Sequence, residues 1–580
     1  MKTYLILSEK KSLAKAIADG VALAISGKVK QAKDYYEVVS KNAKAYVLYL
    51  FGHILEVDLE KTFGDRKNIK LSLKENEIKY KVKKGRYKLF KTIKKFLEDF
   101  KKGKIDYLVI ASDPDREGEL LAREVLHYLG INSNDKRVYR LWFSSLEKTH
   151  IAKCFKKLEQ AIKFYSLYKQ GFYRMYFDLL VGINGSRILQ MAKNSYNLSL
   201  GRVQTPTLYL IYKREKEIEN FKPKPYFVLS AILEKDKIKF KASKKVEKEK
   251  EAKNLLSYLK SKKTLKVEKI EQKKEVVRPP TLPDLASLQI TVGKRFKLSA
   301  SQILKHLQEM YEAKVITYPR TESKFLHEND IEFYKQGLIA LNRKDKIKDI
   351  EKYKKRFVNN RDVEEKGHPA ILIINPLEKM GKFNKIHKAL YDEIAKRMLA
   401  NLEDDALLLR TTITFEKDLK AKGKTILKEG FLKVYKEALE EEKEKQKEDE
   451  AQNKFLPKLE KGEEVKKISE KMEKRFTKPP ERYTSSSLIS TLKKLGLGTQ
   501  ATRHMFEEVL LKRGYIRKDK KGKIYLTDLG RELIENLLQK KARLIDIKLT
   551  SELEKELQKE PEKVKGKIKD LIEELKNVFL

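Results

Sequence analysis

Hydrophobic positions in the first 150 residues follow two different periods. Short apolar runs at residues 3–9 (TYLILSE) and 105–113 (IDYLVIASD) have the length of buried strands, and residues 35–57 have the pattern of a hairpin. Helical periodicity follows from about Ser12 and again after Glu117. Strands that alternate with helices in this way predict an α/β domain over residues 1–150 with a mostly parallel sheet.

The later pattern changes between strands and helices. Strand patterns over residues 216–278 and 405–469 flank a helical block at 279–404, which predicts one discontinuous β-rich domain with an inserted helical domain that swings as a body. Two unrelated small sheets are the alternative. The remaining residues, 151–215 and 470–580, are expected to form one further helical domain. The expected fold class is therefore multidomain, with α/β and α+β parts.

A weak internal repeat runs through the helical regions. Residues 279–318 and 479–518 both begin at Pro-Pro, continue as helix, turn and helix, and end in a short strand. The second copy extends into a hairpin pattern at 514–527 (GYIRKDKKGKIYLT), which predicts a winged-helix module that contacts nucleic acid. An ordinary helical subdomain is the alternative.

Charge identifies the expected partner. The 580 residues include 130 Lys and Arg against 84 Asp and Glu, a net charge of +46, which favours a polyanion and DNA in particular. An anionic membrane is the competing partner, but the sequence has no apolar run of about 18 residues and no signal-peptide pattern, so we expect a cytoplasmic, nucleoid-associated protein without a membrane partner. Cys154 is the only cysteine, which excludes internal disulfides and paired-cysteine zinc sites.

Acidic residues follow the second apolar run. Asp113, Asp115, Glu117 and Glu119 occupy every second position of ASDPDREGELL, and clustered carboxylates without Cys ligands are typical of Mg²⁺ sites. A helix N-terminus whose acids complement the dipole is the alternative. That alternative explains Glu117 and Glu119 but not the pair Asp113 and Asp115, so we favour a metal site.

A tyrosine in the stretch VITYPRTES is the candidate nucleophile. Pro319 restricts Tyr318 to an extended backbone, and extended residues two apart point to the same side, so Tyr318 and Arg320 are expected to share a face. A nucleophile beside an anion binder is one interpretation, and an ordinary strand with a surface tyrosine is the other.

These segments together carry a resemblance. The chain resembles type IA DNA topoisomerases, particularly the topoisomerase III-like branch of archaea and bacteria, and the likeness runs from about residue 4 to residue 530. The matching stretches, in chain order, are LILSEKKSLAKAIADG, FGHILEVD, ASDPDREGE, RLWFSSLEKTHI, FDLLVGINGSR, LSLGRVQTPTL, ITYPRTES, GHPAILI and RYTSSSLISTLKKLGLGTQATR. The resemblance implies a Toprim domain joined to a toroidal body whose gate opens to pass DNA.

The resemblance also implies roles for individual residues. Tyr318 matches the tyrosine that becomes linked to the 5′ phosphate of a cleaved strand, and Arg320 matches its phosphate partner. Glu9 and Lys10 match the glutamate and lysine of the first Toprim motif, and His368 matches a histidine near the cleavage site. The implied metal is Mg²⁺ with Glu9, Asp113, Asp115 and Glu117 as ligands, and the implied DNA-binding residues are Arg174, Arg187, Arg202, Gln204, Thr499 and Arg503.

This sequence departs from the family pattern in four places. Lys11 replaces a proline after the first motif, Glu322 replaces an aspartate in the tyrosine motif, and SLGR replaces SVGR or SAGR. No zinc-finger cysteines follow residue 530. Three aromatics, Tyr173, Tyr176 and Phe177, are candidates either for stacking on bases or for core packing.

The expected activity is cleavage and religation of one DNA strand without ATP, which agrees with the lack of a GxxxxGK[ST] stretch. Arg320 is expected to favour the phenolate of Tyr318, and Glu9 is expected to protonate the leaving 3′ oxygen. The resemblance implies relaxation of negative supercoils by a monomer, with decatenation left open. Action with a separate helicase in a reverse-gyrase-like or dissolution complex, a non-catalytic DNA scaffold, and a Toprim nuclease or primase are the alternatives.

Overall fold

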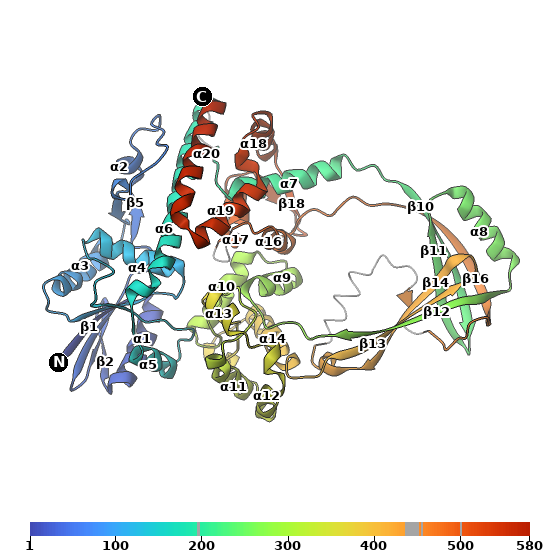
Figure 1. Ribbon diagram of the computed structural model, residues 1–580, viewed down its shortest axis with the longest axis horizontal. Coiled ribbons are helices and arrows are strands. Elements are labelled where there is room, and N and C mark those ends of the chain that lie inside the picture. Colours follow the sequence, from blue (N-terminus) through green and yellow to red (C-terminus); the bar gives the residue numbers. More distant parts are fainter. Residues whose placement is uncertain (194–197, 436–451, 454–455, 499–501) are drawn as a thin grey trace.

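The computed structural model describes residues 1–193, 198–435, 452–453, 456–498 and 502–580. Its ribbon follows a ring (Figure 1). An α/β domain and a group of long helices form one side of the ring, and a β sheet forms the opposite side. Two arms connect the sides, one through α7 (Gln204–Glu219) and the other through β12 (Thr264–Val277) and β13 (Ala406–Phe415).

The amino-terminal domain is built on a seven-stranded sheet with the order β2-β3-β4-β1-β7-β8-β9. Strand β1 pairs in parallel with both β4 and β7, and the register places Ser8 opposite Ala111. Apolar residues of β1 and β7 are buried because helices cover both faces of the sheet. The strands are β1 (Lys2–Ser8), β2 (Lys28–Gln31), β3 (Tyr35–Val39), β4 (Ala43–Tyr49), β7 (Tyr107–Ala111), β8 (Val138–Arg140) and β9 (Glu159–Gln160), and the helices are α1 (Lys11–Ile25), α3 (Tyr87–Lys101), α4 (Arg116–Tyr128) and α5 (Lys148–Lys156).

A small excursion separates β4 from α3. It consists of α2 (Leu59–Phe63) and a two-stranded sheet of β5 (Leu55–Val57) and β6 (Tyr80–Val82). Phe63 is buried in the core that it shares with the long helix α6 (Tyr165–Lys193), so the excursion joins the α/β domain to the helical body.

The distant sheet contains strands from both β-rich stretches. Its order is β11-β10-β16-β12-β13-β14-β15, and a single bridge between β11 and β14 brings its two ends together. Because β10 pairs with β16 and β12 pairs with β13, two unrelated sheets are excluded. The further elements are β10 (Pro225–Lys235), β11 (Ile238–Val246), α8 (Glu249–Ser261), β14 (Leu419–Lys428), β15 (Gln452–Asn453) and β16 (Glu464–Phe476).

The helical block inserted into this sheet packs against the α/β domain. Its buried residues belong to the same hydrophobic cluster as those of α1 and β1. Helices α9 and α10 start at side-chain caps, Asp284 and Ser299, as the polar residues before each apolar run favour. The helices are α9 (Leu285–Phe296), α10 (Ala300–Glu312), α11 (Ile331–Ala340), α12 (Ile350–Tyr353), α13 (Asn360–Lys366) and α14 (Lys385–Ala400).

The carboxy-terminal region forms a helical body with α6 and α7. The predicted hairpin is confirmed as β17 (Ile516–Lys518) paired with β18 (Ile524–Leu526). The two repeat units pack on each other, since α9 lies on α16 and α10 contacts α17. The other helices are α16 (Ser485–Lys494), α17 (Arg503–Lys512), α18 (Asp528–Gln539), α19 (Ile547–Lys559) and α20 (Val564–Phe579).

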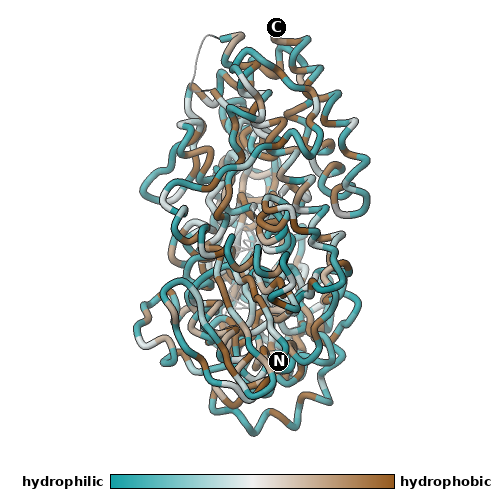
Figure 2. The backbone as a smooth tube through the Cα atoms, turned by 90° about the vertical axis from the view of Figure 1, so that its left-hand side faces the viewer, coloured by the Kyte–Doolittle hydropathy of each residue, from teal (hydrophilic) through white to brown (hydrophobic). Residues whose placement is uncertain are grey.

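Hydrophilic and hydrophobic stretches alternate along the tube throughout the chain (Figure 2). No described helix has the length and apolarity required to cross a bilayer. The division of the chain into the four domains expected from the sequence stays a prediction.

Candidate active site

Two neighbouring parallel strands bring the first acidic residues to one edge of the sheet. Strand β1 ends at Ser8, immediately before Glu9, and β7 ends at Ala111, two residues before Asp113. Since the strands are in parallel register, Glu9 and Asp113 leave the sheet at the same carboxyl edge, where α/β proteins bind ligands.

The loop after β7 is fixed by the start of α4. Asp115 is the N-cap of α4, and its Oδ1 accepts a hydrogen bond of 2.8 Å from the Gly118 N–H. A Cβ atom at Gly118 would lie 2.0 Å from the Asp113 carbonyl oxygen, so only glycine fits there. The close approach of α4 to its own loop sets the position of both aspartates.

Arg140 fixes the same loop through hydrogen bonds to its backbone carbonyls. Its Nη1 donates to the Ser112 carbonyl at 3.0 Å, and its Nη2 donates to the Asp113 carbonyl at 3.0 Å. Its Nε pairs with the buried carboxylate of Glu119, which also accepts from Arg123 at 3.0 Å. Sequence reasoning missed this clamp, although Arg140 lies in the RLWFSS stretch. An arginine within an apolar strand pattern was the available signal.

Tyr318 reaches this loop from the inserted helical block. Its hydroxyl donates to Asp115 Oδ2 at 2.7 Å, although the two residues lie 203 positions apart. Its backbone N–H donates to the Ser144 carbonyl at 3.0 Å. Tyr311 of α10 packs edge-on against the ring, with centroids 5.4 Å apart. The tyrosine is only 1% exposed, so the alternative of a surface tyrosine is wrong.

Arg320 and His368 complete the pocket around the phenol. The Nε of Arg320 is buried and has no hydrogen-bond partner. The imidazole of His368 lies 4.6 Å from the Tyr318 ring and stacks on Trp142 with planes 7° apart. Its Nε2 bonds to the Pro114 carbonyl, so Nε2 carries the proton and the partnerless Nδ1 presents a lone pair.

The pKa values of the three acids shift in different directions. Burial, with Glu9 next, raises the pKa of Asp113 to about 8. Burial, with Asp115 as the main charge acting in the same direction, also raises the pKa of Glu9, although Lys10 opposes the rise. Burial opposes ionisation of Asp115 as well, but Arg320 and the Gly118 N–H outweigh it and lower its pKa. The site therefore pairs an ionised Asp115 with two acids that retain protons more readily.

The phenol itself is held in its neutral form. Burial and the charge of Asp115 raise the pKa of Tyr318 well above its usual value, and Arg320 only partly opposes them. The expectation that Arg320 favours the phenolate is correct in direction, but in this closed arrangement burial outweighs it. Burial lowers the pKa of His368 to about 4, so this imidazole is neutral near pH 7.

Only part of the predicted metal set fits a divalent cation. Asp113 Oδ2 is buried without a partner, which is the state of a carboxylate that a cation would satisfy. Glu117, in contrast, pairs with Arg174 at 2.6 Å, and Glu119 is used in the Arg140 clamp. The alternating spacing would place these acids on one face only in an extended chain. A helix begins after Asp115, so Glu117 and Glu119 point in other directions.

The other sequence-predicted residues lie at several distances from this pocket. Lys10 is close, with its Nζ 3.8 Å from Glu9 and 3.6 Å from Glu312. Arg503 pairs with Glu322 at 2.9 Å, so the glutamate that replaces the family aspartate has a defined partner. Thr499 lies outside the described residues.

Besides Arg174 and Arg503, three more of the predicted DNA-binding residues are engaged within the protein. Arg202 is buried, pairing with Glu554 at 2.6 Å and with Asp178 at 3.1 Å. Arg187 donates to the carbonyls of residues 64, 65 and 68, and Gln204 donates to Ser199 at 3.3 Å. Tyr173, Tyr176 and Phe177 are buried in the core around α6, which decides for core packing over base stacking.

Comparison with known proteins agrees with this geometry. Residues 4–146 match the Toprim domain, and residues 163–568, more than two thirds of the chain, match the DNA topoisomerase family model. The chain belongs to the type IA DNA topoisomerases.

Relatives of this topoisomerase carry two names. DNA topoisomerase 1 of Methanocaldococcus jannaschii is 34% identical over 95% of the chain and 70% of that protein. DNA topoisomerase 3 of Bacillus licheniformis is 35% identical over 74% of the chain and 62% of that protein. The structure of full-length topoisomerase I from Thermotoga maritima superposes with a TM-score of 0.72 at 25% identity, covering 99% of this chain and 89% of that one. The Toprim domain and the multidomain topoisomerase body expected from the sequence are thus confirmed.

Proposed function

We propose that this topoisomerase cleaves one DNA strand through Tyr318, passes another strand through the break and religates it, without ATP. The observation that carries the proposal is the Tyr318 hydroxyl lying 2.7 Å from Asp115 of the Toprim loop. A phenol brought so close to an acidic loop by a separate part of the chain has the arrangement of a nucleophile at a phosphate-handling site.

The bond exchange balances without an energy source. Attack by the Tyr318 oxygen forms a bond to phosphorus and breaks the bond to the 3′ oxygen, so a 5′-phosphotyrosyl link replaces one phosphodiester. Asp115 already accepts the phenolic hydrogen bond, which makes it the nearest base for that proton. Glu9 is the proposed donor to the 3′ oxygen, because burial raises its pKa and so favours its protonated form.

Arg320 is the proposed phosphate ligand. Its Nε is a buried donor without a partner, and such a donor is costly unless a ligand satisfies it. A phosphate oxygen would accept from this group in a charge-assisted bond. DNA entry must also separate Tyr318 from Asp115, because the phosphorus atom has to lie next to the phenol oxygen.

Asp113 and Asp115 are the proposed core of a Mg²⁺ site, with Glu9 nearby. Bound Mg²⁺ would neutralise phosphate charge and hold the DNA ends for religation. Glu117 would contribute only after its pair with Arg174 opens. This site is the proposed reason for the unpartnered oxygen of Asp113.

The proposed gate lies between the inserted helical block and the α/β domain. Opening would break the Tyr318 N–H bond to Ser144 and the contacts that Glu147 makes with Asn375 at 2.8 Å and with Lys379 at 2.6 Å. These hydrogen bonds and ion pairs are polar contacts, which are common between domains that move relative to one another. The inserted block would then swing on its two connections to the distant sheet.

The proposed substrate is single-stranded segments of negatively supercoiled DNA, acted on by a monomer in the nucleoid, and decatenation is a possible second outcome of the same cycle. The net charge of +46 supports a DNA partner. No contact of the described residues favours a helicase partner, which stays a prediction.

Plasmid relaxation tests the proposal. With Mg²⁺ and no ATP, the purified chain is expected to relax negatively supercoiled plasmid in steps of one linking number and to leave positively supercoiled plasmid unchanged. EDTA should stop relaxation. Steps of two, or a requirement for ATP, would contradict the proposal.

A further inference from the structure

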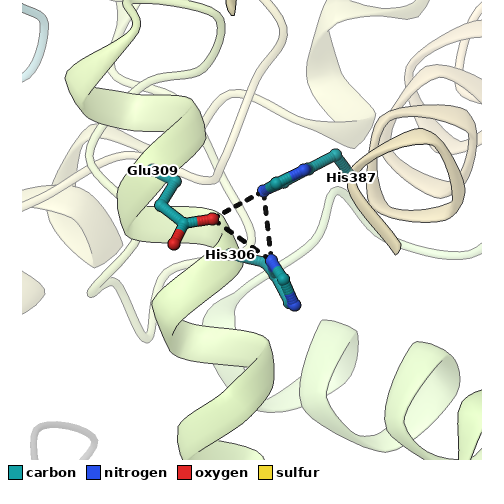
Figure 3. Close-up of side chains that lie close together, drawn as sticks. All are labelled: His306, Glu309 and His387. Carbon is teal, nitrogen blue, oxygen red and sulfur yellow. Dashed lines mark hydrogen bonds and ion pairs between the residues drawn. The ribbon is translucent and has the colours of Figure 1, made fainter. Parts of the chain in front are cut away.

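A cluster of metal-ligating side chains lies away from the acidic loop. His306 and Glu309 lie one turn apart on α10, and His387 lies at the start of α14 (Figure 3). The three side chains point toward one another between the two helices. Among the residues that the structure describes, this is the only set of three such side chains with ligand atoms gathered closely enough for one metal ion.

The three atoms form a nearly regular triangle. His306 Nδ1 lies 3.1 Å from His387 Nε2 and 3.3 Å from Glu309 Oε2, and His387 Nε2 lies 2.8 Å from the same carboxylate oxygen. Zinc binds histidine nitrogen and carboxylate oxygen at about 2.0–2.2 Å, so two tetrahedral ligands lie about 3.4 Å apart. The triangle therefore matches one face of a zinc tetrahedron after expansion by a few tenths of an ångström.

Without a cation, the two rings share one carboxylate oxygen as their acceptor. Two ring nitrogens and one carboxylate oxygen face one point, and each neutral imidazole has only one N–H. The Asn384 N–H donates to His387 Nδ1 at 3.2 Å, so Nε2 of that ring holds the proton and donates to Glu309. A proton on His306 Nδ1 can also donate to Glu309 Oε2, 3.3 Å away, but it leaves two N–H groups whose nitrogens are only 3.1 Å apart. A cation between the three atoms would remove that close approach of two donors.

We propose that His306 Nδ1, Glu309 Oε2 and His387 Nε2 bind one borderline divalent cation, such as Zn²⁺, which links α10 to α14. Two imidazoles and one carboxylate suit such a cation better than Mg²⁺, which prefers oxygen ligands. Three protein ligands leave the fourth coordination position of a tetrahedral cation open. The Glu309 side chain is 40% exposed, so water can reach that position.

Binding requires a change at His387. Its proton must move from Nε2 to Nδ1, which costs the hydrogen bond from the Asn384 N–H. That bond belongs to the cap of α14, but the Asn384 side chain still accepts from the N–H groups of Ile386 and His387 at 2.9 and 3.1 Å. The helix start thus keeps most of its capping when the cation is bound.

Zinc binding to the full chain tests this site. In buffer with excess Mg²⁺ to occupy carboxylate sites, the wild type is expected to bind one Zn²⁺ per chain by equilibrium dialysis and to melt at higher temperature with zinc. His306→Ala and Glu309→Gln, which leave the α14 cap intact, should each weaken binding at least tenfold and abolish the zinc-dependent rise. His327→Ala removes a histidine outside the cluster and should behave as wild type.

Location is tested separately by anomalous diffraction at the zinc edge, which should show a peak between His306 and His387. The proposal is overturned if about 100 µM zinc leaves the wild type unloaded, if His306→Ala or Glu309→Gln binds zinc as the wild type does, or if the peak lies elsewhere. None of these outcomes depends on DNA cleavage.

Discussion

The Tyr318 hydroxyl donates a 2.7 Å hydrogen bond to Asp115 Oδ2, and this bond joins the inserted helical block to the Toprim loop. The same carboxylate caps α4 through the Gly118 N–H. Asp115 therefore has two functions in this structure, because it orders its own loop and holds the phenol of Tyr318, the proposed nucleophile, in its neutral form. Loading of DNA must replace the second contact.

Neutralising Asp115 should lower the pKa of Tyr318. After burial, the charge of Asp115 is the largest influence that raises this pKa, while Arg320 lowers it. Asp115→Asn removes the charge and leaves Arg320 in place, so the phenol should titrate at lower pH than in the wild type. NMR of ¹³C-labelled tyrosine measures this, with Tyr318→Phe identifying the signal. An unchanged or higher pKa would show that the charge of Asp115 does not raise the pKa of Tyr318.

Stability should depend on pH through Asp113. Its folded-state pKa of about 8 lies above the unfolded value near 3.8, so the contribution of this group is fully present below about pH 4 and is lost as pH rises through about 8. Without divalent cations, the free energy of unfolding should fall across this range by up to about 1.4 kcal/mol per pH unit. Thermal melting in EDTA from pH 5 to 9 measures the fall, and Mg²⁺ should oppose it.

Two variants control that measurement. Asp113→Asn should flatten the pH dependence, leaving the smaller part due to Glu9, while Asp236→Asn in an exposed turn should leave it as in the wild type. A pH profile that is the same in Asp113→Asn and the wild type would rule out Asp113 as its source.

Gly118→Ala should disable the acidic loop. The added Cβ would lie 2.0 Å from the Asp113 carbonyl oxygen, so α4 and the loop would have to separate. Relaxation activity is expected to fall at least tenfold, because misplacing reacting groups by about 1 Å costs about 10²-fold. Gly566→Ala on α20 is the matched control, since a Cβ there meets nothing within 4 Å. Equal activity of the two variants would contradict the role of the close approach.

Removing the clamp should destabilise the α/β domain. Arg140→Ala frees four backbone carbonyls and leaves Glu119 with Arg123 as its only buried cation, which should cost about 3–5 kcal/mol. Arg137→Ala removes a half-exposed arginine that pairs with Asp135, and its cost should stay below about 1 kcal/mol. Urea unfolding followed by far-ultraviolet circular dichroism measures both. Similar midpoints for the two variants would count against the clamp.

Local patterns predicted the parts of the site that depend on strand ends. The apolar runs before Glu9 and Asp113 form buried parallel strands, so both acids leave at one edge of the sheet. Tyr318 and Arg320 lie close enough for each to affect the pKa of the other, which agrees with the closeness predicted from the step at Pro319. These features depend on residues close in sequence, so local sequence patterns are enough to predict them.

Pairings between distant residues could not be read in the same way. Glu117 was expected to bind metal but pairs with Arg174, and Arg202 was expected in the DNA groove but pairs with Glu554, 352 residues away. A buried charge finds whichever partner the fold brings near, and local spacing carries no trace of that choice. The Arg140 clamp was missed for the same reason.

Trapping the covalent intermediate tests the central claim most directly. The chain is mixed with single-stranded DNA labelled at its 3′ end and with Mg²⁺, stopped with denaturant, and separated by gel electrophoresis. The wild type should carry label on the 5′-linked fragment, while Tyr318→Phe should carry none and Tyr311→Phe should still do so. An adduct in Tyr318→Phe, or label retained only when the DNA is marked at its 5′ end, would contradict the account.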